Sequence, residues 1–205
     1  MTGVAGLVLA AGAGRRLGGP KALLRLDGVP LAERAVRGAR DGGCAPVVVV
    51  LGAAADRVRA VADLTAATVV VNPRWATGLG SSLRAGLAAL GGTDATAALV
   101  LLVDTPGVGA EAVRRVAAHG DDEHVLACAT YGGRPGHPVL LGRAHWAAIA
   151  ARADGDAGAR RYLRAAGPAV VEVPCDGIAA PADVDTAEDA RRHGIDPGDA
   201  VPWGP

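Results

Sequence analysis

The sequence predicts a single α/β domain with one doubly wound, mostly parallel, Rossmann-like sheet and helices on both of its faces. Short runs rich in Val and Leu alternate along the chain with amphipathic segments, an order typical of β-α-β units. A length of 205 residues suits one compact domain. The 30 glycines and 13 prolines recur between the apolar runs rather than in one tract, which argues against a disordered chain.

Five short apolar runs carry the strand signal. Each is bounded by turn residues, as expected for a strand that is buried on both faces of a parallel sheet. The runs are Val4–Ala10, Pro46–Leu51, Thr68–Val71, Ala97–Val103 and Ala169–Val173. Ligands of such sheets bind where the strands end at the carboxyl edge, so the loops that follow these runs are the places to look for a site.

Between the runs, apolar side chains recur at helical spacing. Three stripes are visible: Leu31, Ala35, Val36 and Ala39; then Leu79, Leu83, Leu87 and Leu90; then Val113, Val116 and Ala117. Two further helical pieces are predicted at Arg143–Ala153 and Ala157–Ala166.

After residue 120 the alternation changes, and the sequence predicts a small β excursion. It consists of Val125–Thr130, a glycine turn at Tyr131–Pro135 and Val139–Leu141. We expect the domain to span residues 1–193. Residues 194–205 have no periodicity, and we expect them to form a flexible C-terminal tail.

Charge and cysteine content narrow the class of protein. The 21 basic and 21 acidic residues cancel, which argues against a nucleic-acid or membrane-surface partner. No apolar stretch reaches the ~18 residues of a membrane span, and the first basic residues follow the N-terminal apolar run, unlike a signal peptide. Cys44, Cys128 and Cys175 share no close spacing, so we expect free thiols in a cytoplasmic protein.

The segment Leu9–Lys21 is a glycine-rich turn that follows the first strand. Glycines let backbone N–H groups approach an anion, and Arg16 and Lys21 add positive charge to the same loop. A bound triphosphate would find charge-assisted partners there. The residues alone leave a plain tight turn with surface cations equally open.

A dinucleotide site is the competing interpretation of this loop. Gly12-x-Gly14-x-x-x-Gly18 resembles a nicotinamide or flavin fingerprint, which requires an acidic residue at the end of the second strand. The second strand is instead followed by 52–55, Gly-Ala-Ala-Ala, and Asp56 comes late. The loop does not fit a P-loop either, so the Arg16 and Lys21 pair favours a mononucleotide triphosphate.

Acidic residues supply the candidate metal ligands. Asp104 directly follows the most apolar run, which places it at the carboxyl edge of the sheet, where it can hold Mg²⁺ or cap the next helix. Asp183 and Asp185 are candidates for a second ligand. Asp185 can equally cap a predicted helix at Thr186–His193.

Several other residues have a functional and a structural interpretation. The start of the Leu-striped helix, with Gly78 and Ser82, can contact a base or ribose, or its serines can simply cap the helix. Trp75 is better explained as a packing anchor than as a stacking platform. His137, between Gly136 and Pro138, is a tentative substrate contact or a structural histidine.

An ordered series of motifs resembles the MobA-like nucleotidyltransferases, and most closely their MocA-like, molybdenum cofactor cytidylyltransferase branch. The series covers roughly residues 5–190. It comprises Leu9–Lys21, Asn72–Leu83, Leu102–Pro106, Gly136–Pro138, Gly155–Arg160 and Asp183–Asp189. Gly14 and Thr105 differ from the usual residues of that branch, which leaves the identities of the base and the acceptor open.

The resemblance implies an activity and a set of roles. An NMP, CMP by preference, would move from CTP to a phosphorylated acceptor such as molybdopterin, and pyrophosphate would leave. Catalysis would fall to Arg16, Lys21 and Asp104, with Mg²⁺ on Asp104 and Asp185, His137 near the acceptor, and a possible molybdoenzyme maturation partner. The nucleotide-binding residues would be Leu9, Ala10, Ala11, Gly12, Gly14, Arg16, Lys21, Gly78 and Ser82.

Two questions stay open at this point. An NAD(P)H-dependent oxidoreductase of the nicotine-blue type is the alternative function, because some similar chains carry that label. Arg160 and Arg161 can meet an anionic acceptor or face solvent, and the sequence slightly favours solvent.

Overall fold

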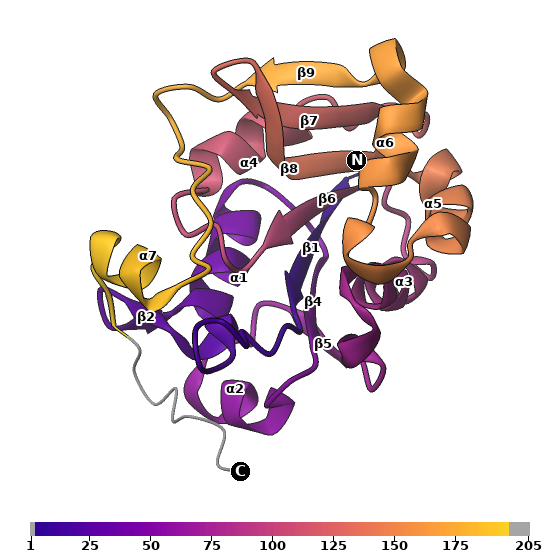
Figure 1. Ribbon diagram of the computed structural model, residues 1–205. Helices are drawn as coiled ribbons and strands as arrows, with labels where there is room; N and C mark the ends of the chain where they lie inside the picture. The colour runs from indigo at the N-terminus through magenta and orange to yellow at the C-terminus, as the bar shows by residue number, and fades with distance from the viewer. Residues whose placement is uncertain (1–2, 197–205) are drawn as a thin grey trace.

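The computed structural model describes residues 3–196, which fold around a seven-stranded sheet (Figure 1). The strand order is β5-β4-β1-β6-β8-β7-β9, and only β8 runs against the others. The strands are β1 (Val4–Ala10), β4 (Val47–Leu51), β5 (Thr68–Val71), β6 (Ala97–Leu102), β7 (Leu126–Tyr131), β8 (Arg134–Gly142) and β9 (Val171–Pro174). The first four have the Rossmann order, so the predicted fold class is confirmed.

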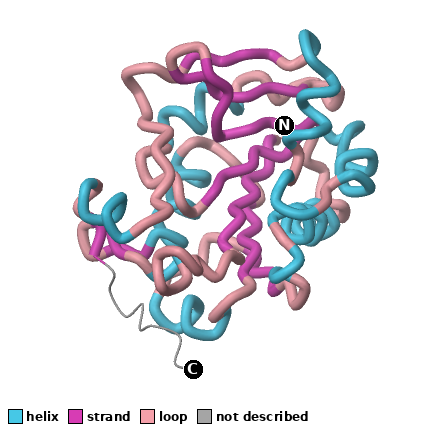
Figure 2. The backbone as a smooth tube through the Cα atoms, viewed as in Figure 1, coloured by secondary structure: helices cyan, strands magenta, loops and turns pink. Residues whose placement is uncertain are grey.

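Helices cover both faces of the sheet (Figure 2). One face packs against α1 (Leu31–Asp41), α2 (Ala55–Val61) and α4 (Ala110–Ala117), and Ala190 of α7 (Ala187–Arg192) belongs to the same apolar cluster. The other packs against α3 (Leu79–Leu90), α5 (Trp146–Arg152) and α6 (Arg160–Ala166). The sequence analysis did not predict α2. Among residues 3–196, no helix has the length and apolar character needed to cross a membrane.

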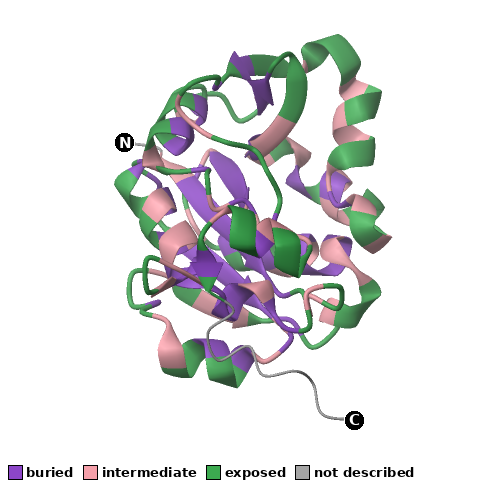
Figure 3. Ribbon diagram, turned by 60° about the vertical axis from the view of Figure 1, so that its left-hand side comes forward, coloured by how far each residue is buried: buried purple, intermediate pink, exposed green. Residues whose placement is uncertain are grey.

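The central strands are buried on both faces, as Figure 3 shows. In β1, Leu7 and Leu9 face the α3 side, whereas Val8 and Ala10 face the α1 side. The same alternation in β4 and β6 explains why these strands are almost purely Val, Leu and Ala. Cys44, Cys128 and Cys175 are buried free thiols, as predicted.

The two outermost strands differ from the prediction. Val71 in β5 is 47% exposed and Val171 in β9 is 41% exposed, so these runs are not buried on both faces. Both strands lie at the edges of the sheet, where a missing neighbour leaves part of the strand uncovered.

The predicted β segment after residue 120 is present and belongs to the main sheet. β8 inserts between β6 and β7 and pairs antiparallel with both, so the predicted hairpin extends the main sheet. Local sequence marks the turn between β7 and β8, but it does not specify which strand their hairpin joins.

The boundary drawn at residue 193 also needs correction. Ile195–Asp196 form a short strand, β10, which pairs with β2 (Arg25–Leu26) in a small second sheet completed by β3 (Val29–Pro30). Ile195 is buried. The start of the predicted tail therefore belongs to the fold, because an apolar residue there packs against the body. Residues 197–205 lie outside the described residues.

Candidate active site

A cleft of about 720 Å³ opens where β1 and β6 end, at the carboxyl edge of the sheet. Five segments that are distant in sequence form its walls. The lining residues are Leu9, Ala11, Gly12, Ala13, Gly14, Arg15, Arg16 and Lys21; Trp75, Ala76, Gly78, Leu79 and Ser82; Leu102, Val103 and Asp104; Asp156 and Arg160; and Asp183 and Asp185. Most of the predicted site residues thus meet in one place.

The loop after β1 coils around the carbonyl group of Gly14. The N–H groups of Leu17 and Gly18 donate to that oxygen at 2.9 and 3.0 Å. Gly14 has a φ of +60°, and a Cβ there would lie 1.9 Å from the carbonyl oxygen of Gly19. Glycine is therefore required at this position for the loop to close.

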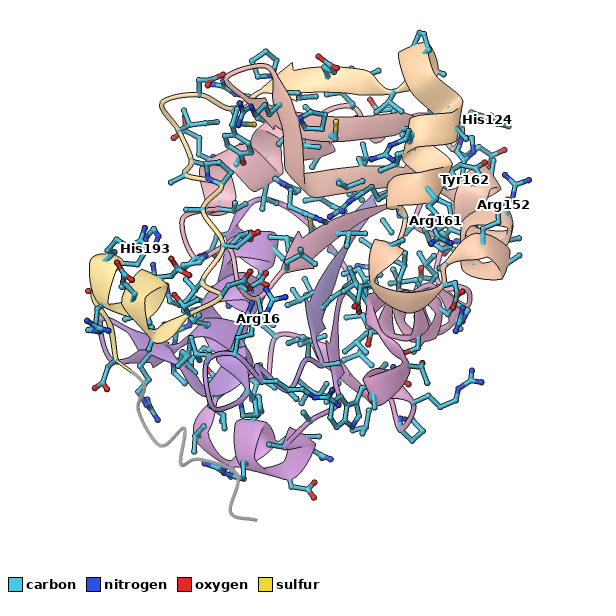
Figure 4. All side chains as sticks on the ribbon, viewed as in Figure 1. Arg16, His124, Arg152, Arg161, Tyr162 and His193 are labelled. Carbon is cyan, nitrogen blue, oxygen red and sulfur yellow. The ribbon has the colours of Figure 1, made fainter. Side chains whose placement is uncertain are left out.

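The coil leaves backbone donors free at the cleft. The N–H groups of residues 12–16 donate to none of the residues that the structure describes. A run of unpaired N–H groups beside cations is an arrangement that binds phosphate oxygens. Arg16, with an 82% exposed side chain, lies at the open side of this loop (Figure 4).

Lys21 links two acidic residues across the cleft. Its Nζ donates to Asp104 Oδ2 at 2.8 Å and to Asp185 Oδ1 at 2.5 Å. Arg16 Nη1 lies 3.9 Å from the other oxygen of Asp185. Lys21, Asp104 and Asp185 thus converge on a single point although 164 positions separate the first from the last.

Hydrogen bonds of the backbone hold the segments that carry Asp104 and Asp185 next to each other. The N–H of Val184 donates to the Asp104 carbonyl at 2.9 Å, which fixes the segment before α7 against the end of β6. Thr186 caps α7 through a capping box with Asp189, and Asp189 also accepts from the N–H of Asp185 at 3.3 Å. Thr186 is therefore the cap, and the Asp185 side chain remains available to the cleft.

The donor set around Asp104 fits a divalent cation. Asp104 Oδ1 is buried and has no hydrogen-bond partner among the described residues, while Oδ2 holds Lys21. A buried carboxylate oxygen without a partner is costly unless a ligand satisfies it. Residues 3–196 contain no preformed cluster of three metal-ligating side chains. Mg²⁺ is commonly bound by one or two carboxylates plus substrate phosphates, which is what this arrangement offers.

The charges in the cleft shift two pKa values upward. Burial lowers the pKa of Lys21, but the charges of Asp104 and Asp185 and the hydrogen bonds to them outweigh it, so Lys21 stays protonated. Burial raises the pKa of Asp183, and the charges of Asp104 and Asp185 raise it further, against Lys21 and Arg160. Of the two candidates for the second ligand, Asp185 is the one bonded to the Lys21 bridge.

A buried polar group supports the opposite wall, at the start of α3. Asn72 Nδ2 donates to Ser81 Oγ at 2.8 Å and to Ser82 Oγ at 3.1 Å, and Asn72 Oδ1 accepts from the N–H of Arg74. All of this lies under the cleft surface, where Ser82 contributes to the lining. Asn72 therefore positions the serine that the sequence analysis singled out.

Gly78 joins this wall to the turn before α6. Its φ is +109°, and a Cβ would lie 2.4 Å from the carbonyl carbon of Gly155. Trp75 packs closely over Gly52 and also lines the cleft, so it serves as the expected packing anchor and forms part of the site surface.

Two predicted residues are placed differently from the rest. The Ala10 side chain faces the core on the α1 side and does not line the cleft. His137 lies outside the lining, and its Nδ1 contacts the Val100 carbonyl oxygen at 3.2 Å, while its own carbonyl accepts from Tyr131. Burial lowers the pKa of His137, so the ring is neutral near pH 7. His137 does not line the described cleft, and its contact with an acceptor stays a prediction.

Sequence reasoning did not assign a role to Asn72 or Asp156, and for Arg160 it slightly favoured solvent over an anionic acceptor. Asn72 could have been noticed as a polar side chain directly after a strand. Asp156 and Arg160 belong to a glycine-containing motif that was recognised, but only the fold shows that this motif forms a wall of the cleft.

Comparison with known proteins agrees with this geometry. The family model described as "MobA-like NTP transferase domain" matches residues 6–172. The chain is 41% identical over 198 residues to "Nicotine blue oxidoreductase" of Paenarthrobacter nicotinovorans, covering 92% of this chain and 95% of that protein. It is 34% identical over 202 residues to "Molybdenum cofactor guanylyltransferase" of Rhodobacter capsulatus, with coverages of 92% and 94%.

A solved structure shares the whole fold. The Rv0371c complex with manganese from Mycobacterium tuberculosis H37Rv is 31% identical, has a TM-score of 0.77, and the match covers 94% of this chain and 98% of that one. The family match, the shared fold and the cleft at the carboxyl edge lead to one conclusion: this chain belongs to the MobA-like NTP transferase family.

Proposed function

We propose that the protein is a Mg²⁺-dependent nucleotidyltransferase that moves an NMP, CMP by preference, from a nucleoside triphosphate to a phosphorylated acceptor such as molybdopterin. Pyrophosphate is the second product. One observation carries this proposal: unpaired amides after β1, the cation Lys21, and the carboxylates Asp104 and Asp185 occupy one cleft. These features match the oxygens, the charge and the metal of a magnesium triphosphate.

The loop after β1 would hold the part of the triphosphate that departs. The amides of residues 12–16 can donate to the β- and γ-phosphate oxygens, and the Gly14 coil fixes their directions. Arg16 and Lys21 would offset the negative charge that accumulates as pyrophosphate leaves. A single electrostatic contact of this kind lowers a barrier by about 3–4 kcal/mol.

Asp104 and Asp185 would hold the metal. Asp104 can offer its unpartnered Oδ1 while Oδ2 keeps its bond to Lys21. Mg²⁺ bound there supplies charge neutralisation of the phosphate oxygens. The manganese of the Rv0371c complex supports a divalent ion in such a fold.

The described cleft needs no protein nucleophile. An acceptor phosphate is already ionised near pH 7, so it can attack the α-phosphorus directly. The residues then contribute by positioning the two substrates and by neutralising charge.

The nucleobase would lie against the start of α3, beside Gly78 and Ser82. Asn72 fixes Ser82 from below. Preference for cytosine and for molybdopterin rests on the resemblance to the MocA-like branch. Thr105, which departs from that branch, is buried, donates to the Leu102 carbonyl at 3.0 Å and does not line the cleft.

The oxidoreductase alternative has weaker support in the geometry. A dinucleotide site of the Rossmann type needs a carboxylate at the end of the second parallel strand, here β4. β4 ends at Leu51, and residues 52–55 carry no acidic side chain. Because the similar Paenarthrobacter protein is called a nicotine blue oxidoreductase, NADPH is included among the ligands tested.

Thermal shift measurements with CTP, GTP, ATP, NADH and NADPH, each with and without Mg²⁺, separate the two functions. We expect stabilisation by CTP that depends on the metal and disappears with EDTA. Stabilisation by NADPH alone, independent of metal, would favour the oxidoreductase.

Pyrophosphate release then tests the chemistry. With molybdopterin as acceptor, Asp104→Ala and Asp104→Asn should remain folded and lose turnover by some hundreds-fold. Asp94→Asn is the matched control, because Asp94 is exposed at the other end of β6. Unchanged turnover in the Asp104 variants would refute the metal assignment.

A further inference from the structure

We infer that Arg160, at the start of α6, binds the phosphate of the acceptor on the side of the α-phosphorus opposite to the leaving pyrophosphate. This inference rests on the proposed function and assigns a specificity residue to it. Arg160 is a cleft-lining residue, whereas its neighbour Arg161 does not line the cleft. The sequence alone slightly favoured solvent for both.

Arg160 is an uncommitted cation. Within residues 3–196 it makes no hydrogen bond or ion pair, not even with Asp156 one helical turn earlier. Lys21, by contrast, is bonded to two carboxylates, and Arg16 faces Asp185. A guanidinium with all its donors free in a cleft is suited to bidentate binding of phosphate.

The platform that carries Arg160 is tightly packed. Gly155 lies so close to Gly78 that a Cβ on Gly78 would be 2.6 Å from the Gly155 carbonyl oxygen. Gly158 has a φ of +51° and packs against Leu79, and Arg84 of α3 donates to the Ala153 carbonyl. The turn before α6 is thus attached to the wall that would hold the nucleobase.

The position of Arg160 fits the geometry of phosphoryl chemistry. The attacking and leaving oxygens lie roughly in line through the phosphorus, so an acceptor must approach from the side away from the pyrophosphate loop. Figure 4 shows Arg16 and Arg161 well apart, on the loop after β1 and on the start of α6. The charge of Arg160 also acts on His137 of β8. Burial is the main cause of the lowered pKa of His137, and the Arg160 charge adds to it.

The distribution of positive charge makes the Arg160 end of the cleft the place where a second anion can bind. The amides of residues 12–16, together with Arg16 and Lys21, are used by the triphosphate in the proposed function, and Arg15 belongs to the same loop. Arg160 is the remaining cleft-lining cation outside that loop among the described residues. The ligand is therefore a phosphomonoester dianion, not a neutral hydroxyl acceptor.

The test compares Arg160→Gln, Arg160→Lys and the matched control Arg161→Gln. We expect KM for molybdopterin to rise about 10- to 100-fold in Arg160→Gln, with KM for CTP unchanged, because one charge-assisted contact is lost. Arg160→Lys should recover part of the loss, since charge remains without the planar fork. An equal rise in both KM values, or no rise, would overturn the inference.

A binding measurement keeps this result separate from failure of the proposed function. Inorganic phosphate is titrated into each variant by calorimetry, with CTP and Mg²⁺ saturating and no acceptor present. We expect Arg160→Gln to bind phosphate at least tenfold more weakly than wild type and Arg161→Gln. Equal affinities refute the role of Arg160 whatever the turnover, whereas a wild type that releases no pyrophosphate refutes the proposed function. If no nucleotide binds, the same titration on the bare protein decides the role of Arg160.

Discussion

Replacing Lys21 with methionine tests the bridge on which the cleft depends. The Lys21 side chain is 16% exposed and links Asp104 to Asp185. Methionine keeps the apolar stem but carries no charge, so Asp104 loses its cation and Asp185 keeps only the exposed Arg16, at 3.9 Å. Removing one partner of such an arrangement costs more than the net contribution of the pair.

The size of the effect follows from the exposure of the three groups. Two opposite charges 4 Å apart attract by about 4 kcal/mol at an effective dielectric constant near 20. Asp185 is 48% exposed, so solvent screens its share, and Lys21 regains hydration on unfolding. We therefore expect Lys21→Met to lower the free energy of unfolding by about 2 kcal/mol, which lowers Tm by about 4–8 °C in a chain of this size.

A double-mutant cycle with Asp104→Asn measures this interaction without any nucleotide. Urea unfolding of the wild type, both single variants and the double variant should give a coupling energy of about 1 kcal/mol or more. Arg161→Met controls for the loss of an exposed cation. Losses that add to within about 0.3–0.5 kcal/mol would show that the bridge does not form in solution and would refute the convergence of these residues.

Three further predictions follow from local geometry. Gly14→Ala should abolish stabilisation by CTP and Mg²⁺ in thermal shift, because its Cβ would lie 1.9 Å from the Gly19 carbonyl oxygen. The control Gly92→Ala should keep the stabilisation, because a Cβ on Gly92 would lie in open space. A normal shift in Gly14→Ala would contradict the loop assignment. Asn72→Ala should lower the free energy of unfolding in urea by about 1–3 kcal/mol and weaken CTP binding, because it leaves the buried partners of Asn72 unpaired. A loss under about 0.5 kcal/mol would argue against its positioning role. Burial raises the pKa of Cys44 to about 12 from an ordinary 9.0. The thiol therefore ionises first in the unfolded chain, so the free energy of unfolding is unaffected by this group below pH 9 and falls above it by about 1.4 kcal/mol per pH unit. Iodoacetamide should not label native Cys44 at pH 8.5, and rapid labelling would contradict its burial.

Periodicity predicted the elements whose burial is uniform. β1 and β6 are central, so every residue in them is apolar and the run is unmistakable in the sequence. β5 and β9 carry similar runs, yet their place at the edges depends on topology, which no local pattern specifies. α2 is short and begins after small residues, so its periodicity is too brief to detect.

The site was predictable where its chemistry is local. Gly14, Arg16 and Lys21 lie within one loop, and Asp104 directly follows a strand. The meeting of Asp104 with Asp185 depends on a backbone hydrogen bond from Val184, which links distant segments and leaves no mark in sequence spacing. Arg160 and Arg161 are adjacent and chemically identical, so only the packing of the preceding turn distinguishes them.

The pairing of β10 with β2 has a consequence for how the protein is made. Arg25–Leu26 follow Lys21 almost immediately, whereas their partner strand, Ile195–Asp196, comes much later in the sequence. A ribosome must therefore synthesise the chain through residue 185 before Asp185 can join Asp104. A product that ends before Asp185 cannot assemble the acidic pair that Lys21 bridges.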